Sequence, residues 1–174
     1  MILDDLKELE QESRDRGIPI IGSEKGAWLL KQVQEIKPKT ILELGTANGY
    51  SGIILASEGA KLTTVEQDDT IAKEAWVNFV TFNLEPQLII GDGSIIIHSF
   101  PDNHFDIIFI DFAKKKYFTI LEEAIRTVNK GGYIIADNIT MVGCQDYNKA
   151  IEHDERLRTE IITIRDGLSK SERV

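Results

Sequence analysis

Four residues in the second half of the chain have side chains that metal-assisted proton transfer uses. Asp111 and Lys114 stand three residues apart in the segment DFAKKKY, and Asp137-Asn138 follows the next strongly apolar run. Carboxylate and amide oxygens are hard ligands that suit Mg²⁺ or Ca²⁺ better than zinc. Asp111, Asp137 and Asn138 are therefore candidate metal ligands. The alternative for Asp137-Asn138 is a simple chain turn, which Asx residues favour.

Lys114 is the candidate base beside these ligands. A lysine near a metal and a buried pocket can have a lowered pKa, which lets it accept a proton. Its position in the sequence allows it to turn back over the end of the strand that precedes Asp111. Lys115 and Lys116 are expected at a solvated helix start instead.

A glycine-rich turn occurs earlier, in the stretch ILELGTANGYSG. Gly45, Gly49 and Gly52 have the spacing G-x-x-x-G-x-x-G, which differs from the G-x-G-x-x-G that fits a pyrophosphate. The looser turn favours a nucleoside without phosphates, and a purely structural turn is the alternative. Glu66 follows Gly45 at the spacing of about 20 residues where an acid accepts ribose hydroxyls. A solvated strand end is the alternative for Glu66.

These candidates follow apolar runs, so strands and the helices between them must position them. The pattern predicts strands at 40–45, 61–66, 86–91, 105–111 and 133–137. It predicts helices at 2–16, 23–37 with Ser23 as N-cap, 49–59, 69–84, and 114–132 closed by paired glycines.

This alternation predicts an α/β fold with a doubly wound, mostly parallel, Rossmann-like sheet of seven strands. The runs 105–111 and 133–137 are almost entirely apolar, which is typical of parallel strands buried on both faces. Asp166-Gly167 lies between the last two extended runs and predicts a C-terminal antiparallel hairpin. Ligands of such sheets bind at the carboxyl ends of the strands, where the candidate acids lie.

Composition narrows the class of protein. The chain has 174 residues, a formal net charge of −9 and one cysteine, Cys144. We therefore expect a single domain over 1–174, no internal disulfide and a cytoplasmic, soluble protein. The N-terminus differs from a signal peptide, and no run approaches the ~20 apolar residues that span a bilayer, so no membrane partner is expected. The acidic charge argues against nucleic acid but leaves a local basic patch open.

Together these motifs resemble the class I S-adenosylmethionine-dependent methyltransferases. More narrowly, the chain is similar to the metal-dependent O-methyltransferases that include catechol and caffeoyl-CoA O-methyltransferases. The resemblance runs from Ile18 to the C-terminus. It rests on six segments in the family's order: IIGSEKGAWLL, LELGTANGYS, VEQDD, FIDFAKKKY, GGYIIADN and DERLRTEIITIRDGLSKSERV.

The resemblance implies a role for each matching position. The methionine end of S-adenosylmethionine would meet Glu43, Gly45, Ser51 and the backbone near Ile21, Glu66 would bind the ribose, and Gly91-Asp92-Gly93 would border the adenine. The complete implied cofactor set is Ile21, Glu43, Gly45, Thr46, Ser51, Glu66, Gly91, Asp92, Gly93 and Asp111. The implied metal, most simply Mg²⁺, would bind Asp111, Asp137 and Asn138. Lys114 and Asp111 would be catalytic.

The activity implied by the resemblance is methyl transfer from S-adenosylmethionine to a hydroxyl of a small catechol-like aromatic acceptor. A homodimer is compatible with it. Two alternatives stay open: a methyltransferase for hydroxylated tRNA bases, and a non-catalytic cofactor-binding protein. The chain departs from the family in a short segment between Asn138 and Thr159 and in Met141, which replaces a common tryptophan. These departures predict an open acceptor pocket.

Overall fold

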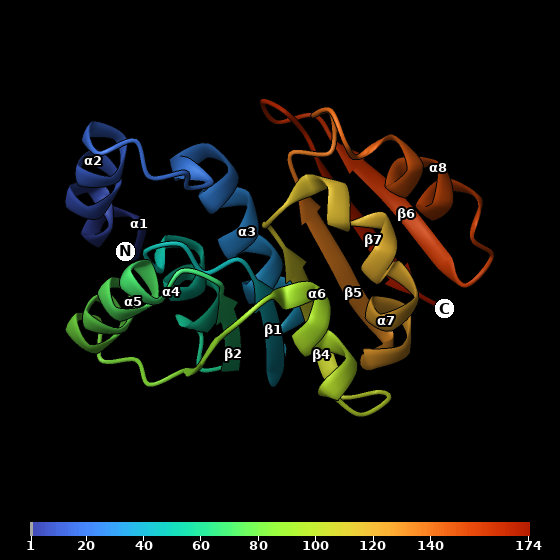
Figure 1. Ribbon diagram of the computed structural model, residues 1–174, viewed down its shortest axis with the longest axis horizontal. Coiled ribbons are helices and arrows are strands. Elements are labelled where there is room, and N and C mark those ends of the chain that lie inside the picture. Colours follow the sequence, from blue (N-terminus) through green and yellow to red (C-terminus); the bar gives the residue numbers. More distant parts are fainter. Residues whose placement is uncertain (1) are drawn as a thin grey trace.

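The computed structural model describes residues 2–174 and has an α/β architecture (Figure 1). One sheet of seven strands has the order β3-β2-β1-β4-β5-β7-β6. The strands are β1 (Thr40–Leu44), β2 (Lys61–Glu66), β3 (Gln87–Ile90), β4 (Phe105–Ile110), β5 (Val128–Asp137), β6 (Leu157–Ile162) and β7 (Leu168–Arg173). Strands β1 to β5 pair in parallel, and β7 pairs antiparallel with β5 and β6. The predicted sheet and its closing hairpin are therefore confirmed.

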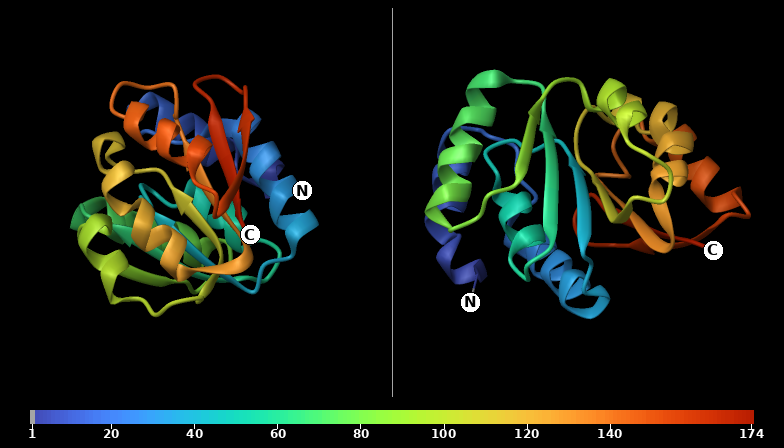
Figure 2. Two further views of the ribbon diagram at one scale, coloured as in Figure 1. Left: turned by 90° about the vertical axis from the view of Figure 1, so that its right-hand side faces the viewer. Right: turned by 90° about the horizontal axis from the view of Figure 1, so that it is seen from below.

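Helices cover both faces of this sheet (Figure 2). They are α1 (Ile2–Asp5), α2 (Lys7–Asp15), α3 (Gly22–Ile36), α4 (Tyr50–Ala56), α5 (Asp69–Thr81), α6 (Gly93–Ile96), α7 (Leu121–Thr127) and α8 (Gln145–His153). Short 3₁₀ turns lie at Ile97–Ser99, Lys114–Lys116 and Phe118–Ile120. Among the described residues, no helix has both the length and the apolar character needed to cross a bilayer.

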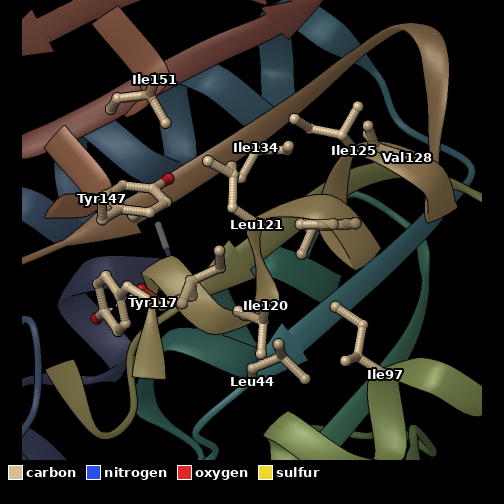
Figure 3. Close-up of a cluster of buried hydrophobic side chains, with 14 of the residues drawn as sticks. Leu44, Ile97, Tyr117, Ile120, Leu121, Ile125, Val128, Ile134, Tyr147 and Ile151 are labelled. Atoms are coloured by element: carbon tan, nitrogen blue, oxygen red, sulfur yellow. Dashed lines mark hydrogen bonds between the residues drawn. The ribbon is translucent and has the colours of Figure 1, made fainter. Parts of the chain in front are cut away.

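The almost continuous apolar sequence of β4 is explained by a core on each side of it. Ile108 and Ile110 join a cluster with residues of α7 and α8, part of which is drawn in Figure 3. Ile107 and Phe109 join a second cluster with residues of α3, α4 and α5. Because successive side chains of a strand point to opposite faces, a strand between two cores must be apolar at nearly every position.

Several predicted bounds differ from the structure: helix 2–16 is divided into α1 and α2, helices 49–59 and 69–84 end three residues early, and β5 begins at Val128 rather than at 133. Two further predictions about helix ends are wrong. Ser23 does not cap α3: the helix begins at Gly22 after Ile21, and the Ser23 backbone N–H donates to a carboxylate oxygen of Glu10 at 3.2 Å. The predicted helix 114–132 is in fact two 3₁₀ turns and α7, which ends at Thr127.

The paired glycines belong to β5 rather than to a helix end. The β4–β5 register shifts after the pair Phe105–Val128, so the residues before Tyr133 bulge out of the ladder. A Cβ on Gly132 would lie 2.8 Å from the carbonyl oxygen of Asp106, which leaves no room for a side chain. The glycine pair therefore serves the bulge, a feature that shares its sequence signal with a helix stop.

Candidate active site

A cavity of about 630 Å³ opens at the carboxyl ends of the parallel strands. The chain passes from β1 outward to β3 and then returns to β4 on the other side of β1, so the strand order reverses between β1 and β4. Ligands of open α/β sheets bind at this reversal. Ten of the residues predicted for the site line the cavity: Gly45, Thr46, Ser51, Glu66, Gly91, Gly93, Asp111, Lys114, Asp137 and Asn138.

Gly45 lets the chain leave β1 against the end of β4. Its φ is 103°, and a Cβ there would lie 2.0 Å from the carbonyl oxygen of Asp111. Its N–H donates to the Val65 carbonyl of β2 at 2.9 Å. A side chain would therefore be both strained and in collision with backbone, which explains the glycine without reference to any ligand.

Glu66 closes the same loop from the end of β2. Its two carboxylate oxygens accept from the backbone N–H groups of Ala47 and Asp68, each at 2.9 Å. The half-buried side chain lines the cavity. Glu66 is thus a fixed acceptor beside the glycine-rich turn, and each carboxylate oxygen has a further lone pair for a ligand hydroxyl.

Glu43 lies behind the cavity wall and does not line the cavity. It is fully buried and accepts hydrogen bonds from Ser51 at 2.5 Å and Thr64 at 2.6 Å. Burial raises the pKa of Glu43 to about 8, against these two hydrogen bonds, and the charges of Asp111 and Glu66 raise it further. Glu43 therefore holds the Ser51 hydroxyl in place by accepting its hydrogen bond.

Two other predicted positions also lie off the main cavity. Ile21 is a buried core residue that borders a smaller neighbouring cavity. Asp92 caps α6 by accepting from the Ser94 N–H at 2.9 Å and forms an ion pair with Lys116. The hydrogen bond from Lys116 lowers the pKa of Asp92 to about 2. Lys116 is therefore tied to α6 rather than freely solvated.

Lys114 turns back over the end of β4, as its spacing predicted. Its Nζ lies 2.6 Å from a carboxylate oxygen of Asp111 and 3.1 Å from the Tyr117 hydroxyl. Tyr117 is fully buried, and its hydroxyl lies 3.0 Å from the carbonyl oxygen of Ile110 and 3.1 Å from that of Asp137. One tyrosine therefore holds the ends of β4 and β5 together, a role that the sequence did not indicate.

Asp137 carries a buried charge beside a second lysine that sequence reasoning missed. Lys25 of α3 is 2% exposed and forms ion pairs with Asp137 and with Asp166 of the β6–β7 turn. Burial and the neighbouring charge of Asp111 raise the pKa of Asp137 to about 6, although Lys25 opposes this. The available signal was a lysine at helical spacing with Leu29 and Val33 on the buried face of α3.

The donor set fits a hard divalent cation. Asp111, Asp137 and Asn138 line one cavity, and in residues 2–174 the second carboxylate oxygens of both acids and the amide oxygen of Asn138 accept no hydrogen bond. The repulsion between the two acids is a cost that a cation would remove. Within the same part of the chain, no three His, Cys, Asp or Glu residues form a ligand cluster, so the candidate set combines two acids with the Asn138 amide.

The family model described as O-methyltransferase matches residues 1–174. The chain belongs to this O-methyltransferase family. Catechol O-methyltransferase B of Danio rerio is 30% identical over 169 residues, which cover 87% of this chain and 64% of that protein. The chain therefore spans less than two thirds of the length of this relative.

Solved structures of O-methyltransferases share the fold. One from Staphylococcus aureus, provisionally assigned as a caffeoyl-CoA O-methyltransferase, has a TM-score of 0.84 at 26% identity and covers 99% of this chain and 92% of its own. TomG from Streptomyces achromogenes, solved in complex with S-adenosylmethionine, has a TM-score of 0.87 at 19% identity, with 97% and 89% covered. At that identity, the likeness to TomG shows the fold alone.

Proposed function

We propose that the chain transfers a methyl group from S-adenosylmethionine to a hydroxyl of a small catechol-like acceptor, assisted by a divalent metal such as Mg²⁺. One observation carries the proposal: Gly45 and Glu66 face the same cavity as Asp111, Lys114 and Asn138. The residues proposed for the nucleoside and those proposed for the metal and the proton therefore line one cavity. The family membership and the names of the relatives support the same proposal of methyl transfer.

The cofactor half would use backbone and Glu66. In this proposal Glu66 accepts hydrogen bonds from the ribose hydroxyls, and Gly91 and Gly93 border the adenine. The turn from Gly45 to Ser51 contacts the methionine end. A cavity of about 630 Å³ is of the size that holds a ligand of this kind. When bound, the cofactor supplies a methyl group on a positively charged sulfur.

The acceptor half would use Lys114 and the three oxygen donors. Asp111, Asp137 and Asn138 would hold the metal, which when bound lowers the pKa of a coordinated hydroxyl. Lys114 takes the hydroxyl proton at Nζ, and Asp111 balances the resulting ammonium charge. In the proposed reaction the acceptor hydroxyl would give its proton to Lys114 and its oxygen would take the methyl group, so the products would be a methyl ether and S-adenosylhomocysteine. Orientation of this kind can supply about 7–11 kcal/mol in well-oriented reactions.

Methyl-labelled S-adenosylmethionine, offered with a panel of catechols in Mg²⁺ and in EDTA, tests this proposal. Label transfer that EDTA abolishes is the expected result. Transfer that is indifferent to EDTA would remove the metal from the reaction. Absence of transfer to every catechol would contradict the acceptor class, and the same assay with tRNA would then test the nucleic-acid alternative.

A further inference from the structure

The turn of the C-terminal hairpin reaches the candidate metal ligands. Asp166 is half-buried, borders the cavity with Asp137 and Asn138, and accepts a hydrogen bond from the side-chain amide of Asn138 at 2.6 Å. The other carboxylate oxygen of Asp166 forms the ion pair with Lys25. Asp166-Gly167 is thus more than a turn signal.

The Asn138 amide has two ends of opposite hydrogen-bonding character. Its nitrogen donates and its oxygen accepts, so a partner for one end decides where the other points. Asp166 is a carboxylate and can only accept, which fixes the Asn138 nitrogen toward the hairpin. Within residues 2–174 the amide oxygen accepts no hydrogen bond, so it is available as a ligand.

Backbone contacts hold the turn against the segment after β5. The carbonyl oxygen of Asp166 accepts from the Thr140 N–H at 3.2 Å and from the Thr140 hydroxyl at 2.9 Å. Gly167 packs on Ile139, where a Cβ would lie 3.1 Å from the side chain. Asn138 itself has a φ of 56°, a left-handed conformation that its surroundings must maintain.

Lys25 joins the same group from the other side. Its buried ammonium pairs with Asp166 and with Asp137, so the hairpin, α3 and the end of β5 meet at one cation. Three elements far apart in the sequence therefore fix two of the three candidate ligands.

We infer that Asp166 is a positioning residue for the metal ligands. It orients Asn138 directly and Asp137 through Lys25. The inference rests on the proposed metal site. Partners behind metal ligands fix ligand orientation, and their loss commonly weakens metal binding by about 10–100-fold.

Mn²⁺ binding, followed by the EPR signal of the free ion, tests this inference without any turnover. Asp166→Ala is expected to raise the Mn²⁺ Kd by about 10-fold or more. Asp166→Asn is expected to give a smaller loss, because its amide oxygen still accepts from Asn138 while its charge toward Lys25 is gone. Arg165→Gln is the control, since the exposed Arg165 pairs with Glu24 outside this group.

The affinity for S-adenosylhomocysteine, measured on the same variants, separates positioning from general damage. It is expected to stay within about two-fold in Asp166→Ala. A Mn²⁺ Kd for Asp166→Ala within two-fold of wild type would overturn this inference but leave the proposed function standing. Equal losses for Mn²⁺ and S-adenosylhomocysteine would also overturn it. A wild-type protein that binds no Mn²⁺ would overturn both the inference and the metal in the proposed function.

Discussion

A Cβ on Gly45 would lie 2.0 Å from the carbonyl oxygen of Asp111. The glycine-rich turn after β1 and the acid after β4 are thus in direct backbone contact at the point where the strand order reverses. The cofactor half and the acceptor half of the proposed site consequently depend on one another through this contact.

Gly45→Ala is predicted to reduce both stability and ligand binding. The positive φ and the overlap with Asp111 together are expected to cost more than about 2 kcal/mol of unfolding free energy. Gly59→Ala is the matched control, because Gly59 has a φ of 88° and nothing within 4 Å of its Cβ position. Urea unfolding and titration with S-adenosylhomocysteine check both variants. Equal effects at the two glycines would show that backbone strain alone matters and contradict the contact.

Glu43→Gln is predicted to change how stability depends on pH. Because burial raises the pKa of Glu43 to about 8, the folded protein keeps a proton that the unfolded chain loses near pH 4.5. Wild-type stability should therefore lose this contribution as pH rises from 4.5 through 8. The glutamine cannot titrate, so the stability of Glu43→Gln relative to wild type should increase over that window. Urea unfolding from pH 5 to 8.5 measures this difference, and parallel curves would refute the assignment.

Tyr117→Phe is predicted to lower stability by about 1–3 kcal/mol, because the two buried carbonyl oxygens lose the one O–H donor that they share. The neighbouring Tyr147 is the control: its ring centroid is 5.6 Å from that of Tyr117, and its buried hydroxyl forms no hydrogen bond with the described residues. Tyr147→Phe should be nearly neutral. The kcat of Tyr117→Phe should also fall, because the Tyr117 hydroxyl contacts Lys114. The KM for S-adenosylmethionine should stay unchanged. Equal stabilities for the two variants would contradict the bridging role of Tyr117.

The strands and the strand-end acids could be predicted because they depend on local pattern. Strand β2 was predicted at its observed bounds, and Asp111 and Asp137 follow from the parallel pairing of β4 with β5. The Ser23 cap failed because a distant residue, Glu10, binds that backbone N–H instead. The homodimer that the resemblance allows and the cytoplasmic location stay predictions.

The partners behind the ligands could not be predicted in the same way. Lys25 and Asp166 are 141 positions apart, and only the folded chain brings them together at Asp137. A hairpin turn and a helix give no local signal that they share a cation. The roles proposed for the site residues therefore combine a sequence pattern with contacts that only the tertiary structure provides.

The most direct test of the central claim compares wild type with Lys114→Met in methyl transfer to a catechol with Mg²⁺ present. The account predicts transfer by wild type and a loss of about 10²–10⁴-fold in kcat for Lys114→Met, the range for a positioned acid or base. Binding of S-adenosylhomocysteine should be unchanged, and Lys115→Met, at the exposed neighbouring lysine, should retain wild-type turnover. Undiminished transfer by Lys114→Met would contradict the account.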